Sequence, residues 1–263
     1  MKIDKSAEQF IKLLGIIEKL RGPNGCPWDK EQTSASLLPY FLEETYEVIE
    51  SIEKRNWENL KEELGDVILH VALQAQISKE EGRFTIFDTL VNINKKLVRR
   101  HPHVFGDEKA DIASHAKKNW EAIKHEEKKR ESRLDGVPLT LPALTRAQRL
   151  QEKAAYAGFD WDNIDSVWEK LHEEIAELKK ADKSKDISYL KEEIGDVLFS
   201  VVNLARHLKL DSEDLLRKAN SKFINRFKAI EKEFVKRGKT IDEANLDEMD
   251  KIWDQIKLSL IHI

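Results

Sequence analysis

The most regular pattern in the chain is an apolar helical stretch that carries two acidic residues three positions apart. It covers residues 60–75, LKEELGDVILHVALQA, and returns at residues 190–205 as LKEEIGDVLFSVVNLA. Apolar residues recur at helical spacing on most sides of both stretches, which predicts two helices that are mostly buried. The acids inside these helices are Glu63, Asp66, Glu193 and Asp196.

Further apolar stripes at helical spacing surround the first copy. They predict helices over residues 10–20, 37–54, 86–100 and 114–129. The second of these helices is expected to be capped by Ser34 or Ser36, because a serine hydroxyl can accept a hydrogen bond from the first turn. Both halves of the sequence show this helical pattern, so the predicted fold is all-α, with a small helical bundle in each half.

The chain also contains an internal repeat. Residues 129–142, KRESRLDGVPLTLP, lose the helical period and hold two of the six prolines, as a linker would. Beyond them, GFDWD at residues 158–162 repeats GCPWD at residues 25–29, and 130 residues separate Glu44 from Glu174. The sequence therefore predicts a tandem duplication. Its expected parts are an N-terminal helical domain, a linker and a C-terminal helical domain, over residues 1–128, 129–142 and 143–263.

Composition excludes several classes of function. The 45 Lys and Arg residues nearly balance the 49 Asp and Glu residues, and the sequence has no basic stripe, so neither nucleic acid nor a membrane is an expected partner. The single cysteine, Cys26, rules out an internal disulfide and fits a reducing compartment. No apolar stretch is long enough to span a bilayer, so a cytoplasmic location is expected.

A second pair of acids precedes each copy of the apolar stretch, on the helix before it. These pairs are Glu44 with Glu47 and Glu174 with Glu177. Residues three apart share a helix face, so two helices joined by a short turn can bring four carboxylates together. An ionised carboxylate buried without a partner costs several kcal/mol, roughly, and residues 64–75 and 194–205 contain no Lys or Arg. The counter-charge is either a salt bridge from elsewhere or a metal ion, and the recurrence of the acids favours the metal.

The ligand types narrow the choice of metal. Carboxylate oxygens without His or Cys favour Mg²⁺, with Mn²⁺ as a substitute. Ca²⁺ also takes oxygen ligands and stays an alternative, but the sequence has no Asp-rich loop of the expected kind. Zinc prefers imidazole or thiolate. A di-iron bundle requires Glu-x-x-His motifs, and Asp66 and Asp196 occupy the positions that histidine would need.

With these landmarks in place, the sequence resembles a known family over nearly its whole length. EETYE…ELGD at residues 43–66 and EEIAE…EIGD at residues 173–196, with the flanking GCPWDKEQT, RRHPHVFGD, GFDWD and VNLARHL, are similar to the two-domain MazG-type all-α nucleoside triphosphate pyrophosphohydrolases. The resemblance implies hydrolysis of nucleoside triphosphates to monophosphate and pyrophosphate. It also implies Mg²⁺ held by the acid motif, and a homodimer or higher homo-oligomer with sites at subunit interfaces. The implied metal ligands are Glu44, Glu47, Glu63, Asp66, Glu174, Glu177, Glu193 and Asp196.

Basic and aromatic residues are candidates for the rest of a triphosphate site. Lys222 and Arg226 are four apart on a helix, and Lys96 and Arg100 repeat them. Such pairs are either ordinary surface cations or phosphate ligands, and the repeat together with the resemblance favours phosphate. Aromatic residues either pack in the core or stack on a nucleobase. Among them Trp253 is the preferred stacking candidate; the others are its counterpart Trp120 and the pair Phe159 and Trp161.

The two halves share their acids but differ around them. Lys170 stands one helical turn before Glu174, where we expect it to reach a metal-bound phosphate, and the first half has Tyr40 at this position. In related two-domain proteins the C-terminal copy is usually credited with catalysis. We therefore expect Glu174, Glu177, Glu193 and Asp196 to form the main catalytic site.

The expected reaction uses metal-activated water on ribo- and deoxynucleoside triphosphates of broad specificity. A narrower enzyme, selective for a pyrimidine deoxynucleotide or an alarmone, remains a second hypothesis. The alternative from another class is a non-catalytic helical regulator that binds nucleotide or a partner and holds a structural metal ion.

Overall fold

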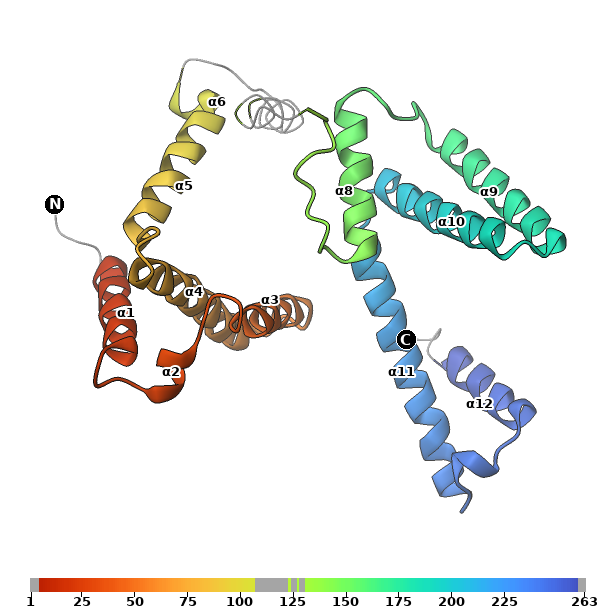
Figure 1. The fold of residues 1–263 in the computed structure, drawn as a ribbon. Helices are drawn as coiled ribbons and strands as arrows, with labels where there is room; N and C mark the ends of the chain where they lie inside the picture. Colours follow the sequence, from red (N-terminus) through yellow and green to blue (C-terminus); the bar gives the residue numbers. More distant parts are fainter. Residues whose placement is uncertain (1–4, 107–122, 124–126, 128–130, 260–263) are drawn as a thin grey trace. The chain divides into compact units, whose positions relative to one another are not determined.

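The computed structural model describes residues 5–106, 123, 127 and 131–259 (Figure 1). It divides into two compact units, Met1–Trp120 and Glu121–Ile263. Every regular element in the described ranges is a helix, so the all-α prediction is confirmed. The helix expected over residues 114–129 lies outside the described residues, apart from two isolated positions. The predicted domain boundaries stay a prediction.

The first unit is organised around a helical hairpin. Its elements are α1 (Lys5–Arg21), α2 (Pro27–Glu31), α3 (Leu38–Glu53), α4 (Trp57–Glu80), α5 (Ile86–Arg100) and α6 (Pro102–Phe105). Helices α3 and α4 pack along each other, and α1 packs on α4. Ile17 of α1 meets Ala72, Leu73 and Ile77 of α4 in the core. The hairpin therefore receives its support from the N-terminal helix.

The second unit repeats the hairpin and has further helices before and after it. Its elements are α8 (Ala143–Tyr156), α9 (Ile164–Ser184), α10 (Ile187–His207), α11 (Ser212–Lys236), η1 (Ile241–Glu243) and α12 (Leu246–Ser259). Helices α9 and α10 form the hairpin, and α8 packs against α10 and α11. A separate cluster of Ile230, Phe234 and Ile252 joins α12 to α11.

Matching turns set the register of the two hairpins. Each ends its first helix near a residue in the left-handed region, Arg55 with φ 53° and Lys185 with φ 60°. The next residue then caps the second helix, because Asn56 accepts from the backbone N–H of Asn59 and Asp186 accepts from that of Ser188. Equivalent turns hold the acid pairs of facing helices at the same height in both units.

The expected serine cap of α3 is wrong. The helix begins at Leu38, and its N-cap residue Leu37 makes no side-chain cap bond. Ser36 instead accepts a hydrogen bond from the backbone N–H of Thr33, and the Thr33 hydroxyl accepts one from the backbone N–H of Ser36, at 2.9 and 3.1 Å. Thr33 and Ser36 therefore bond each other in the turn before the helix, and the Ser36 hydroxyl does not cap α3.

The expectation of mostly buried central helices is also wrong for the chain by itself. Leu64, Ile68 and Val71 of α4 are exposed, although Ala72 and Leu73 are buried. The same division appears in α10, where Ile194, Leu198 and Val201 are exposed. Each helix buries one apolar face inside its unit and leaves a second apolar face uncovered.

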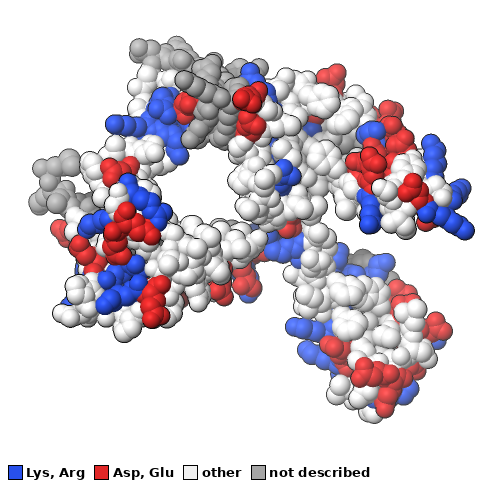
Figure 2. Space-filling view, viewed as in Figure 1, with Lys and Arg blue, Asp and Glu red and all other residues white. Residues whose placement is uncertain are grey.

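Charges on the face shown in Figure 2 are mixed in sign over the described residues, with blue and red atoms interleaved and white areas between them. No described helix combines the length and the apolar character needed to cross a membrane.

Candidate active site

The two hairpins bring their carboxylates together as the sequence predicted. In the first unit, oxygens of Glu44, Glu63 and Asp66 all lie within 4.8 Å of one another. In the second unit the same holds for Glu174, Glu177 and Glu193. The remaining acids act on these groups, because Glu47 raises the pKa of Glu63 and Asp196 raises that of Glu193.

Burial makes these acids electrostatically expensive. Burial raises the pKa of Glu193, with Glu177 and Asp196 adding repulsion, and the side chain is only 7 % exposed. Burial likewise raises the pKa of Glu63 and of Glu44, with nearby carboxylates adding to the shift. Among the described residues, Oε2 of Glu193 is buried and accepts no hydrogen bond. Such a group gains most from a bound cation.

The second cluster contains one fixed positive charge. Nζ of Lys170 lies 2.8 Å from Oε1 of Glu174 and 3.0 Å from Oε1 of Glu173. Hydrogen bonds to Glu174 and then Glu173 raise the pKa of Lys170, so the ammonium stays charged. In the first cluster a neutral group takes part instead, since Nδ2 of Asn59 donates to Oε1 of Glu63 at 2.9 Å.

The donor set fits the expected metal. Both clusters offer carboxylate oxygens alone, which suits Mg²⁺ or Mn²⁺ and not zinc. The unpaired Oε2 of Glu193 supplies a ligand atom that no other described residue uses. Glu174, Glu177 and Glu193 would hold the ion in the second unit, and Glu44, Glu63 and Asp66 would hold it in the first.

A cavity of about 410 Å³ adjoins the second cluster. Lys170, Glu174 and Asp196 line it, together with the aromatic residues Phe159 and Trp161. The expected residues Lys170, Phe159 and Trp161 therefore share one cavity with the acids.

The other predicted substrate residues of the second half lie elsewhere in the unit. The guanidinium carbon of Arg226 lies 5.4 Å from the centroid of the Trp253 ring, and Phe223 packs on the same ring. Lys222 is exposed on α11. None of these side chains lines the cavity beside Glu174.

Their first-half counterparts are more scattered. Lys96 borders a groove with Ile68 and Val71, Arg100 is buried, and Trp120 lies outside the described residues.

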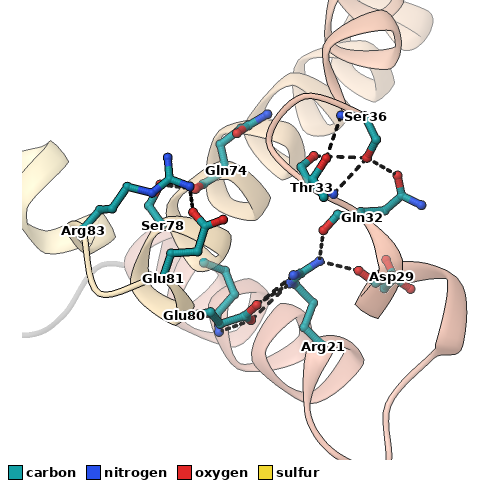
Figure 3. Close-up of polar contacts among 11 residues, drawn as sticks. Arg21, Asp29, Gln32, Thr33, Ser36, Gln74, Ser78, Glu80, Glu81 and Arg83 are labelled. Carbon is teal, nitrogen blue, oxygen red and sulfur yellow. Dashed lines mark hydrogen bonds and ion pairs between the residues drawn. The ribbon is translucent and has the colours of Figure 1, made fainter.

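In each unit, an arginine contacts the segment that carries the repeated motif, GCPWD in the first unit and GFDWD in the second. Arg21 of α1 bridges to the Glu80 carboxylate at 2.7 Å and donates to the backbone oxygens of Asp29 and Gln32 (Figure 3). In the second unit, Arg206 of α10 donates to Asp160 of the GFDWD loop at 2.9 Å.

Sequence reasoning singled out both segments of the second contact, GFDWD and VNLARHL, without pairing them. It missed Gln151 and Asn203, which also line the cavity. The hydrogen bonds from Gln151 to Phe199 and from Arg206 to Asp160 join residues far apart in the chain, so helical periodicity gives no signal for them.

Comparison with known proteins finds one family domain in both halves of the chain. The MazG nucleotide pyrophosphohydrolase domain matches residues 32–105 and again 163–230. The chain is 48 % identical over 250 residues to the nucleoside triphosphate pyrophosphohydrolase/pyrophosphatase MazG of Thermotoga maritima, covering 94 % of this chain and 95 % of that protein. It is 46 % identical over 255 residues to the nucleoside triphosphate pyrophosphohydrolase of Escherichia coli K12, covering 95 % and 97 %. It is also 46 % identical to the Bacillus subtilis protein YabN, in an alignment that covers 52 % of that protein.

The chain therefore belongs to the MazG nucleotide pyrophosphohydrolase family, with two copies of the family domain. The predicted family and the predicted duplication are both confirmed.

Proposed function

We propose that this chain hydrolyses nucleoside triphosphates to nucleoside monophosphate and pyrophosphate in a Mg²⁺-dependent reaction centred on its second half. Family membership makes it a nucleoside triphosphate pyrophosphohydrolase. The observation that carries the finer proposal is the buried, unpaired oxygen of Glu193 beside Glu174 and Glu177, next to a cavity that Lys170 lines.

The charge of each residue indicates its role: the carboxylates bind the metal ion and the lysine binds phosphate. Glu174, Glu177 and Glu193 hold the metal, with Asp196 beside them. When bound, Mg²⁺ would neutralise phosphate charge and lower the pKa of a water; addition of that water would break the linkage between the α- and β-phosphates and leave nucleoside monophosphate and pyrophosphate. One carboxylate of the set orients that water and takes its proton. Lys170 donates to phosphate oxygens once it turns from Glu174, because an ammonium forms charge-assisted hydrogen bonds with phosphate as well as with carboxylate.

The first half carries the same acids in different surroundings. Tyr40 stands where Lys170 stands in the second half, so no cation occupies that position. We assign the first half a weaker or structural role, with Glu44, Glu63 and Asp66 as its metal ligands and Glu47 beside them.

Assembly into a homodimer or higher homo-oligomer completes the proposal. The apolar faces of α4 and α10 are exposed in the single chain, and a second copy of the chain offers the same apolar faces to cover them. In such an assembly Lys222, Arg226 and Trp253 of one copy reach the phosphates and base held by another. In the first half Lys96, Arg100 and Trp120 take the equivalent positions.

The test is pyrophosphate release from a panel of ribo- and deoxynucleoside triphosphates, with Mg²⁺ and with a chelator. Wild type, Asp196→Asn and Asp66→Asn are compared. Metal-dependent release that is lost in Asp196→Asn and kept in Asp66→Asn supports the proposal. Loss in both variants makes the halves interdependent, and no release from any triphosphate favours the non-catalytic regulator with a structural ion.

A further inference from the structure

The cavity beside the second acid cluster contains an unused hydrogen-bond acceptor. Gln151 of α8 lines this cavity and is 7 % exposed. Its Nε2 donates to the backbone oxygen of Phe199 at 2.8 Å, while its Oε1 is buried and has no hydrogen-bond partner among the described residues. The orientation of the amide is fixed by chemistry, since a carbonyl oxygen can only accept. A buried acceptor left unpaired is costly, so its presence in a cavity points to a ligand.

A second amide faces the same cavity. Asn203 of α10 is buried, and its Oδ1 accepts from Nε and Nη2 of Arg206 at 2.9 and 2.7 Å. A guanidinium only donates, so this contact also fixes the amide and leaves Nδ2 of Asn203 as a donor. Two residues that line the cavity therefore carry an acceptor and a donor, the combination that the edge of a nucleobase complements.

The charge in this part of the cavity is already balanced. Arg206 donates to both carboxylate oxygens of Asp160, and Oδ1 of Asp160 also lies 3.0 Å from Nε2 of His207. Burial acts to raise the pKa of Asp160, but its bonds with Arg206 and His207 outweigh burial and lower that pKa. The phosphates belong beside Glu174, because a metal ion held by that carboxylate would also bind phosphate oxygens. Phe159 and Trp161, which are exposed and line the cavity, suit a flat aromatic ring.

The described residues of the first half do not repeat this arrangement. Ser200 lines the cavity, whereas its counterpart His70 is buried with its ring 5.8 Å from that of Phe41. The counterpart of Asn203 is Leu73, which is part of the core of the first unit. Rings and aliphatic side chains thus occupy the equivalent space.

We propose that Gln151 is a specificity-determining residue of the second half, whose Oε1 accepts a hydrogen bond from an N–H group of the substrate's nucleobase, with Nδ2 of Asn203 donating to the same base. This inference rests on the proposed function, because it assigns the base end of the triphosphate held at Glu174. Helix α8 precedes residues 163–230, the second segment matched by the family domain. The reading residue therefore belongs to a helix outside the matched segments.

The experiment compares wild type with Gln151→Met, which keeps the side-chain length and removes the amide. The matched control is Gln74→Met, since Gln74 of α4 also donates to a backbone oxygen, that of Ser34 at 3.0 Å. Substrates are ATP, GTP, CTP, UTP and purine riboside triphosphate, whose base has no N–H that can donate. The same panel is measured for binding as α,β-methylene analogues with Mg²⁺, in which the scissile linkage cannot be hydrolysed.

In wild type we expect kcat/KM for at least one N–H-bearing base to exceed that for purine riboside triphosphate by roughly 10- to 100-fold, as loss of a partner to a buried acceptor implies. Gln151→Met should reduce that ratio to about threefold or less, and Gln74→Met should keep it. An equal loss for every substrate would make Gln151 a structural residue and overturn the inference. An unchanged ratio, or no preference in wild type, would overturn it as well.

The binding measurement separates this inference from the proposed function. If no triphosphate is hydrolysed but the analogues bind with a preference that Gln151→Met removes, the proposed function fails and the base-reading role stands. If hydrolysis is metal-dependent and neither preference changes in the variant, the proposed function stands and the base-reading role fails.

Discussion

Nζ of Lys170 lies 2.8 Å from Oε1 of Glu174, one helical turn further along α9, whereas the equivalent position of α3 is Tyr40. This pair gives the second acid cluster a cation that the first cluster lacks at that position. The contact is half-buried on the lysine side and buried on the glutamate side, so Glu174 is desolvated and Lys170 retains access to the cavity. An ammonium in this place can pass from carboxylate to phosphate with little movement.

Replacing Lys170 by Met should lower kcat/KM for nucleoside triphosphates by roughly 10- to 100-fold, because a hydrogen bond to a charged group contributes about 1.5–3 kcal/mol. Pyrophosphate release at saturating Mg²⁺ measures the effect. Lys179→Met on the same helix, where the lysine is exposed, is the control and should keep wild-type rates. Wild-type kinetics in Lys170→Met would exclude a phosphate contact.

Metal binding should be visible as added stability. A ligand that binds only the folded state stabilises it by RT ln(1 + [L]/Kd), so Mg²⁺ should raise Tm, and the rise should continue with the logarithm of the Mg²⁺ concentration above Kd. Glu193→Gln should lose most of the increase that belongs to the second unit, and Glu63→Gln should lose that of the first. Differential scanning calorimetry with Mg²⁺ and with chelator measures both. A Tm increase that is identical in wild type and in the double variant would place the ion elsewhere.

The pH dependence of stability should reveal the strained carboxylate. Burial and the neighbouring Glu177 raise the pKa of Glu193 above 4.5, so the fold favours its protonated form. Its contribution to stability is therefore present below the unfolded pKa and is lost as pH rises through the folded pKa. Glu193→Gln imitates the protonated form.

In metal-free buffer that variant should be more stable than wild type at neutral pH and no more stable at about pH 4. Denaturant unfolding in the presence of chelator, repeated across this range, gives the comparison. Using the difference between the two proteins cancels groups such as Glu80, whose pKa Arg21 lowers and whose contribution is lost in acid. A variant less stable than wild type at neutral pH would contradict the sign.

The acid clusters could be predicted because they follow from local rules. Spacing of three residues places Glu63 with Asp66 on one helix face, and a short turn returns the chain so that Glu44 meets them. Both steps use neighbours in sequence. The duplication then doubled the signal, since the same acids recur in the second half.

The polar lining of the cavity could not be predicted in this way. The bond from Gln151 to Phe199 and the bond from Arg206 to Asp160 join residues separated by 48 and 46 positions. Their partners depend on how α8 and the GFDWD loop pack on α10, which no periodicity encodes. The predicted cap of α3 was wrong because a local contact competes for the serine: Ser36 bonds to Thr33 in the turn before the helix.

Apolar periodicity also cannot say what covers an apolar face. The pattern of α10 predicted burial, yet Leu198 is 55 % exposed in the chain by itself. The pattern is correct about the chemistry of the surface and silent about whether the cover is the same chain or another copy. Light scattering with size-exclusion chromatography decides between them, and we expect wild type to be a dimer or larger.

Leu198→Glu should then dissociate the assembly or weaken it strongly, because a charge in the desolvated centre of an interface lacks a partner. Activity should fall with assembly, since Lys222, Arg226 and Trp253 do not line the cavity of their own chain. Ile68→Glu tests the equivalent face of α4. Leu139→Glu, at a loop position already 81 % exposed, is the control and should change neither mass nor rate. A monomeric wild type with full activity would mean that the exposed faces remain in solvent and that one chain completes the site alone.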